Sequence, residues 1–349
     1  CHTVTLALTK NKMPRWLSEG ISVYEERQAK PSWGQRMNPN YRSMILGENL
    51  TPISKLSGAF MSPESQLHLQ FAYYQSSLVV EHLIERFGAK AIGNILKDLG
   101  QGIEINVAIE KNTEPMEKLE KSFEQYAQAK ANGMAPGLNW TQPDPEMLRT
   151  GVEEFAKKHP KNYYLLIRNA RRALEADDWE AVKAPCLELI KLFPHQNGGQ
   201  SNAYVMLARA YRELKEHDAE RKTLEIFASM SDDAYPVFQR LAELAAENKD
   251  WEAVRINCER ILEVNPLLPE TYRHLAIAAE AQNKKSLAIE SWQTLLNLDP
   301  LDPAEAHYHL ALLQKEKNNS TAKKHLLMAL EEAPRFRKAL KLLLSWDEK

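Results

Sequence analysis

The chain has 349 residues, which is more than one typical domain and predicts two structural units. Its 45 basic and 47 acidic side chains give a net charge of −2, which excludes a general electrostatic attraction to nucleic acid or anionic membranes. No apolar run approaches the roughly 18 residues that span a bilayer. Three scattered cysteines, Cys1, Cys186 and Cys258, are too few for a disulfide framework or a Cys-based zinc site, and they leave the compartment open.

The first 27 residues predict two short helices separated by a polar break at residues 10–12. The second helix follows Pro14 and contains the segment Trp-Leu-Ser-Glu-Gly-Ile-Ser-Val-Tyr-Glu-Glu, beginning at Trp16. This segment resembles the third-ligand helix of gluzincin zinc peptidases, the branch with thermolysin-like, aminopeptidase N-like and peptidase MA-like domains. In those proteins a His-Glu-x-x-His helix lies just upstream, and Cys1-His2 would be its last two residues.

The resemblance implies a zinc ion bound by His2 and by Glu19, 17 positions later, with water in the fourth position. Histidines at i and i+4 share one helix face, and the glutamate after the first is free to act as general base. That first histidine and that glutamate would lie three and two residues before Cys1, so we expect the fragment alone to hydrolyse peptides poorly. Ser18 or Glu26 is a candidate to orient a ligand by a hydrogen bond.

Each residue of this pattern also has an ordinary interpretation. A histidine near a chain end is usually a polar surface residue, and a glutamate in a first helical turn often only favours the helix dipole. The joint pattern of His2, the Trp-Leu-Ser-Glu-Gly segment and the spacing between them is what predicts the metal site.

A helix is predicted from about residue 63 to 87, after a Pro-, Gly- and Asn-rich surface loop at residues 28–41. Its stripe of apolar and aromatic side chains comprises Leu67, Phe71, Tyr74 and Leu78. The segment beginning Tyr73-Tyr74 resembles the aminopeptidase N-like helix whose tyrosine hydroxyl stabilises the oxyanion, which makes Tyr74 the catalytic candidate and Tyr73 the second choice. A core tyrosine with no catalytic part is the alternative.

Two more helices, at about residues 89–99 and 115–130, complete residues 1–131 as the C-terminal part of a gluzincin-like domain. Residues 132–146 contain several glycines and prolines and predict a linker.

Beyond the linker, prolines recur at positions 194, 266, 300 and 334, and the last three are 34 residues apart. This period resembles that of tetratricopeptide (TPR) repeats, in which small residues let paired helices cross closely. The clearest unit carries Tyr272, Leu275, Ala276, Ala279, Ala288, Trp292, Leu295 and Pro300. Residues 147–349 therefore predict about five repeats and a capping helix near residues 336–346. The expected fold class is mainly α, a zincin-like helical part followed by a right-handed α-solenoid.

Within the array, Cys186 and Cys258 share one inward-facing repeat position, which favours packing over redox chemistry. Asn169, Arg209 and Arg273 are candidate groove residues, with solvated surface as the alternative. His307 and His309 are two residues apart on a helix and face different ways, which argues against a metal pair formed by these two. The other histidines show no ligand spacing.

Two functions follow from these patterns. The first is a zinc-dependent metallopeptidase, in which metal-activated water hydrolyses a peptide bond, joined to an array that binds a protein substrate or partner. The alternative is a catalytically inactive peptidase-like lobe on a TPR scaffold or adaptor protein. Neither function involves nucleic acid, and the substrate, the endo- or exopeptidase mode and the oligomeric state stay open.

Overall fold

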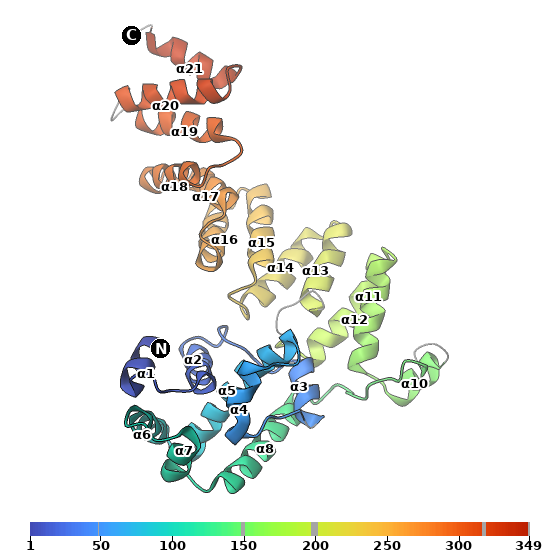
Figure 1. Ribbon diagram of the computed structural model, residues 1–349. Coiled ribbons are helices and arrows are strands. Elements are labelled where there is room, and N and C mark those ends of the chain that lie inside the picture. The colour runs from blue at the N-terminus through green and yellow to red at the C-terminus, as the bar shows by residue number, and fades with distance from the viewer. Residues whose placement is uncertain (48, 148–150, 197–201, 316–318, 348–349) are drawn as a thin grey trace. The chain divides into compact units, whose positions relative to one another are not determined.

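The computed structural model describes residues 1–47, 49–147, 151–196, 202–315 and 319–347. Over these ranges the chain is built from helices, and β-pairing is limited to one isolated bridge between Asn139 and Asn162. The predicted mainly-α fold class is therefore confirmed, while the finer zincin-like assignment stays a prediction. The helices form two compact units, residues 1–214 and 215–349 (Figure 1). In the described part of the chain, no helix has the length and apolar character needed to cross a membrane.

The first unit opens with helices packed around the long helix α5. These elements are α1 (His2–Thr9), α2 (Arg15–Ala29), α3 (Pro39–Leu46), the 3-10 turn η1 (Ile53–Lys55), α4 (Leu56–Met61), α5 (Gln66–Phe87), α6 (Ala89–Gly100), α7 (Ile105–Asn112) and α8 (Met116–Gly133). The Ser65 hydroxyl accepts a hydrogen bond from the His68 amide and caps α5, so this helix begins slightly later than predicted. Trp16 and Leu17 of α2 are buried with Leu78 and Leu83 of α5 in one core. This packing holds α2 along α5.

The reversal between α1 and α2 depends on two left-handed residues. Lys10 and Asn11 have φ values of 50° and 61°, and the Asn11 amide donates to the Leu6 carbonyl. This is the left-handed helix ending that satisfies otherwise unpaired carbonyls in the last turn. The reversal brings the chain back so that α2 passes beside α1.

The rest of the first unit contains α10 (Val152–Lys158), α11 (Tyr163–Glu175), α12 (Trp179–Leu192) and α13 (Ala203–Glu213). Part of the predicted linker packs against them, because Met134 and Leu138 are buried in the same core. The Trp140 ring also stacks on Tyr163, with ring centroids 4.7 Å apart. Residues 132–146 thus contribute to a compact unit that continues to Leu214. The domain boundaries expected from the sequence stay a prediction.

The second unit is a series of helix pairs. It contains α14 (His217–Ala228), α15 (Tyr235–Glu247), α16 (Trp251–Val264), α17 (Pro269–Ala281), α18 (Lys285–Asn297), α19 (Pro303–Gln314), α20 (Asn319–Glu332) and α21 (Arg337–Asp347). The helices α15, α17 and α19 begin 34 residues apart, as do α16, α18 and α20. The turns at Lys249 and Asn283 repeat a left-handed residue with a φ of 57°. The 34-residue helix-pair array and the final helix are therefore confirmed.

The packing of the array follows the predicted alternation of small and large residues. Ala276, Ala279 and Ala288 are fully buried and permit close approach of the helices, while the buried Trp292 ring fills the space left between α18 and its neighbours. The buried residues form successive clusters along the array, and each helix pair packs against the next, which stabilises both.

Cys186 and Cys258 are both fully buried, each in the core of its own unit. Burial raises the pKa of both thiols to about 12, so at pH 8 only about one in 10,000 is ionised. We expect iodoacetamide at pH 8 to modify the exposed Cys1 and to leave Cys186 and Cys258 unmodified, as read by peptide mass spectrometry. Labelling of either buried thiol in the native protein as fast as Cys1 would contradict this expectation.

Candidate metal site

Two glycines bring the helices of the N-terminal site close to their neighbours. A Cβ atom at Gly20 of α2 would lie 2.7 Å from the Ser76 carbonyl oxygen of α5, and one at Gly100 of α6 would lie 2.6 Å from the Leu8 carbonyl oxygen of α1. Both distances are too short for any side chain, so only glycine permits these two approaches. The helix that carries His2 and the helix that carries Glu19 are thereby each seated on a core helix.

The side chains of His2 and Glu19 lie close together. The His2 Nε2 atom lies 3.6 Å from the Glu19 Oε2 atom, with the imidazole half exposed and the carboxylate mostly buried. Two ligand atoms that share a tetrahedral zinc ion, each about 2.0–2.1 Å from it, stand about 3.3 Å apart. The observed separation is close to this value, so the two side chains fit a common zinc ion with little rearrangement.

Two serines of α2 hold the His2 ring. The Ser18 hydroxyl lies 2.8 Å from His2 Nδ1, and the Ser22 hydroxyl lies 3.2 Å from His2 Nε2. Ser18 was one of the two residues expected to orient a ligand; the other, Glu26, is exposed. When Nδ1–H donates to Ser18, the lone pair of Nε2 is directed to the Glu19 side, which is the tautomer that binds a metal ion.

Arg15 links Glu19 to Tyr73, a connection that no motif in the sequence indicates. The Arg15 Nε atom lies 3.4 Å from Glu19 Oε1, and its Nη2 atom donates to the Tyr73 hydroxyl at 2.7 Å. The guanidinium also lies over the rings of Phe60 and Tyr73, which meet edge to face. The signal for the first contact was the i, i+4 spacing of Arg15 and Glu19 on one helix. The contact with Tyr73 depends on the packing of α2 against α5.

Tyr74, the first catalytic candidate, lies in the core. Its side chain is 2% exposed and its ring stacks on Tyr41 with centroids 4.8 Å apart. Burial raises the pKa of Tyr74 well above its ordinary value. The structure therefore places Tyr73, and not Tyr74, in contact with the Arg15–Glu19 pair.

The described residues contain no group of three or more His, Cys, Asp and Glu side chains arranged to bind a metal ion. His2 and Glu19 are thus two ligands of the predicted set, and a complete zinc centre requires a third protein ligand.

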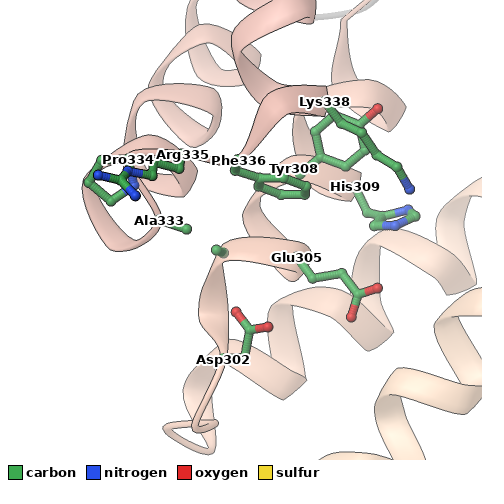
Figure 2. A pocket seen from close by; sticks show the side chains of 10 residues that line it. Asp302, Glu305, Tyr308, His309, Ala333, Pro334, Arg335, Phe336 and Lys338 are labelled. Carbon is green, nitrogen blue, oxygen red and sulfur yellow. The ribbon is translucent and has the colours of Figure 1, made fainter.

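A separate concave site lies in the second unit (Figure 2). This pocket of about 640 Å³ is lined by Asp302, Ala304, Glu305, Tyr308, His309, Ala333, Pro334, Arg335, Phe336 and Lys338. Its walls therefore carry both acidic and basic groups beside the paired rings of Tyr308 and Phe336.

Of the predicted groove residues, Asn169 and Arg209 are exposed, and the Arg209 guanidinium lies 5.4 Å from the centre of the Trp179 ring. Arg273 forms ion pairs with Glu305 and Glu270. Both arginine side chains therefore contact other residues of the array.

No family model matches the chain, and no curated protein matches it. Solved helical-repeat proteins of similar fold include a MamA protein, with a TM-score of 0.40 and 14% identity over 50% of this chain and 93% of that one. A second is YrrB, described as a TPR protein with an unusual peptide-binding site, with a TM-score of 0.44 and 14% identity over 55% and 97% of the two chains. A third is TTC0263, a thermophilic TPR protein of Thermus thermophilus, with a TM-score of 0.31 and 16% identity over 52% and 97%. These similarities concern fold alone and leave the gluzincin resemblance untested.

Proposed function

We propose that this chain combines a protein-interaction array of helix pairs with part of a zinc-dependent peptidase centre. The interaction array has the broader support, because helix pairs with a constant period make up most of the second unit. Its expected ligand is a protein or an extended peptide. The peptidase centre is supported by one observation, the 3.6 Å separation of His2 Nε2 and Glu19 Oε2.

The side chains at this centre have distinct roles in the proposal. His2 and Glu19 bind the ion, and Ser18 keeps the imidazole in the binding tautomer. The ion, when bound, polarises the scissile carbonyl and lowers the pKa of its water ligand. By the gluzincin resemblance, the set also requires a second histidine ligand and a general-base glutamate.

Arg15 and Tyr73 are proposed to act on the substrate side. Arg15 donates from Nη2 to the Tyr73 hydroxyl at 2.7 Å, and its Nε atom lies 3.4 Å from Glu19 Oε1. A neutral hydroxyl held beside the metal ligands is suited to donate to the oxyanion that forms when water attacks the carbonyl. In this proposal Tyr73 takes the part that the sequence assigned first to Tyr74.

The second candidate function is a scaffold with an inactive lobe. This function is favoured because both side chains already have partners within the protein. Glu19 is paired with Arg15, and both ring nitrogens of His2 contact serine hydroxyls. Such a lobe would be stable without an ion and would leave binding to the helix pairs.

Zinc analysis and a hydrolysis assay on the intact protein distinguish the two functions. We expect about one zinc ion per chain, and hydrolysis of quenched fluorescent peptides that a chelator abolishes and added zinc restores. Much less zinc, together with no hydrolysis, would support the scaffold.

Tyr73→Phe and Tyr74→Phe form a matched pair on the same helix. If Tyr73 donates to the oxyanion, Tyr73→Phe lowers kcat by about 10²–10³. Tyr74→Phe removes a hydroxyl buried in the core, so we expect kcat to stay unchanged and the free energy of unfolding to change by only about 1 kcal/mol. Steady-state kinetics and urea unfolding check both statements, and a large fall in kcat in Tyr74→Phe alone would reverse the assignment.

A further inference from the structure

Two histidines of the second unit face each other across a helix pair. His307 lies on α19 and His325 on α20, with their Nδ1 atoms 3.0 Å apart and their ring centroids 5.2 Å apart. They are 18 residues apart in sequence, so no ligand spacing indicates the pair. His309, the neighbour of His307 by sequence, is engaged elsewhere: its Nδ1 lies 2.9 Å from a Glu280 oxygen and its ring stacks on Trp292.

The separation of the two nitrogens suits a shared metal ion. Two imidazole nitrogens bound at about 2.0–2.1 Å stand about 2.9 Å apart at a right angle and about 3.3 Å apart at the tetrahedral angle. The observed 3.0 Å lies between these values. The 5.2 Å between the ring centroids shows that the two Nδ1 atoms now point nearly straight at each other, as in a hydrogen bond, so both rings must turn before their lone pairs meet at one ion. The same two nitrogens can instead share one proton, with one ring protonated at Nδ1, whereas metal binding requires both rings to carry their proton on Nε2.

We propose that His307 and His325 form a two-histidine site for a divalent transition-metal ion of the Zn²⁺, Ni²⁺ and Cu²⁺ class, with water as the remaining ligands. Imidazole is a preferred ligand for these ions and a poor one for Mg²⁺ and Ca²⁺. This proposal does not rest on the peptidase centre.

The packing of the helix pair keeps the two rings close together. Ala311 of α19 and Ala322 and Ala329 of α20 are fully buried, which indicates close packing of the two helices. Both imidazoles are half-buried, and burial lowers the pKa of each below its ordinary value. They are therefore neutral at pH 7, which is the form that binds a metal ion.

The expected consequence is a link between α19 and α20. An ion that binds the folded pair and not the unfolded chain stabilises the fold, and the stabilisation grows with the logarithm of the free ion concentration above the Kd. Among the described residues no third His, Cys, Asp or Glu completes this site. Binding is therefore expected to be reversible and readily removed by a chelator.

Zinc titration of the full chain by calorimetry tests the site. All variants carry His2→Ala as well, so that the N-terminal centre does not contribute. We expect His307→Ala and His325→Ala each to weaken zinc binding at least about tenfold, the equivalent of about 1.4 kcal/mol. The matched control is His274→Ala, a partly buried histidine of α17 in the same unit, which should leave the affinity unchanged.

A local measurement makes the test independent of folding defects. In the protein with both histidines, zinc should shift the Nδ1 resonances of His307 and His325 together in nitrogen-15 spectra of the imidazoles, and a chelator should reverse the shifts. Unchanged resonances at saturating zinc, or equal zinc affinity in all three variants, would overturn the proposal. Neither result would bear on the zinc content expected from His2 and Glu19.

Discussion

On the proposed peptidase function, Glu19→Gln is expected to remove zinc from the N-terminal centre of the intact protein and to abolish hydrolysis. The carboxylate lies 3.6 Å from His2 Nε2 and is the only charged ligand of the predicted set that these residues supply. An amide is a much weaker zinc ligand, and the change also leaves Arg15 without its anionic partner. We expect kcat/KM to fall by more than about 100-fold. This is a larger fall than that caused by losing a residue that only hydrogen-bonds a metal ligand. Zinc content, measured with His307→Ala present so that the second proposed site does not contribute, and peptide hydrolysis measure the effect.

The controls for this experiment lie on the same helix. Ser18→Ala removes only the hydrogen bond to His2 Nδ1, so zinc affinity should fall by about 10–100-fold without complete loss. Glu25→Gln changes an exposed carboxylate of α2 and should leave zinc and activity unaltered. Full zinc content in Glu19→Gln would exclude this residue as a ligand.

Gly20→Ala is expected to destabilise the first unit, although alanine is the better helix former. The added Cβ would lie 2.7 Å from the Ser76 carbonyl oxygen, which belongs to the backbone of a buried helix and cannot turn aside. Relief of the overlap must move α2 away from α5, at a cost of about 1–3 kcal/mol in the free energy of unfolding. Because Glu19 adjoins Gly20, zinc affinity should fall as well. Urea unfolding and zinc titration measure the two effects.

Gly93→Ala is the matched control. Gly93 also lies within a helix, α6, but a Cβ there meets open space. Helix propensity then dominates, and we expect stabilisation of up to about 1 kcal/mol. Gly93→Ala is expected to stabilise the protein. If Gly20→Ala stabilised it too, α2 could not lie as close to α5 at Gly20 as the structure shows.

The sequence determined the features that depend on local periodicity. The 34-residue proline spacing predicted an array of helix pairs, because each repeat packs against its neighbour by the same residues. In the structure, helices with this period begin at Tyr235, Pro269 and Pro303. The motif around Trp16 predicted the approach of His2 and Glu19, because a short turn between two helices leaves few ways for the second to pass the first. Both arrangements follow from short stretches of chain.

Only the tertiary structure decided which side chains meet across different helices. On α5, adjacent positions point about 100° apart, so the packing of α2 against α5 places Tyr73 beside Arg15 and Tyr74 in the core. The facing of His307 and His325 likewise depends on how closely α19 approaches α20. Periodicity shows that a residue lies on a buried or exposed face, but the crossing of two helices selects its partner. The sequence therefore predicted the helical elements and pointed to His2 and Glu19, and the packing determined the contacts around them.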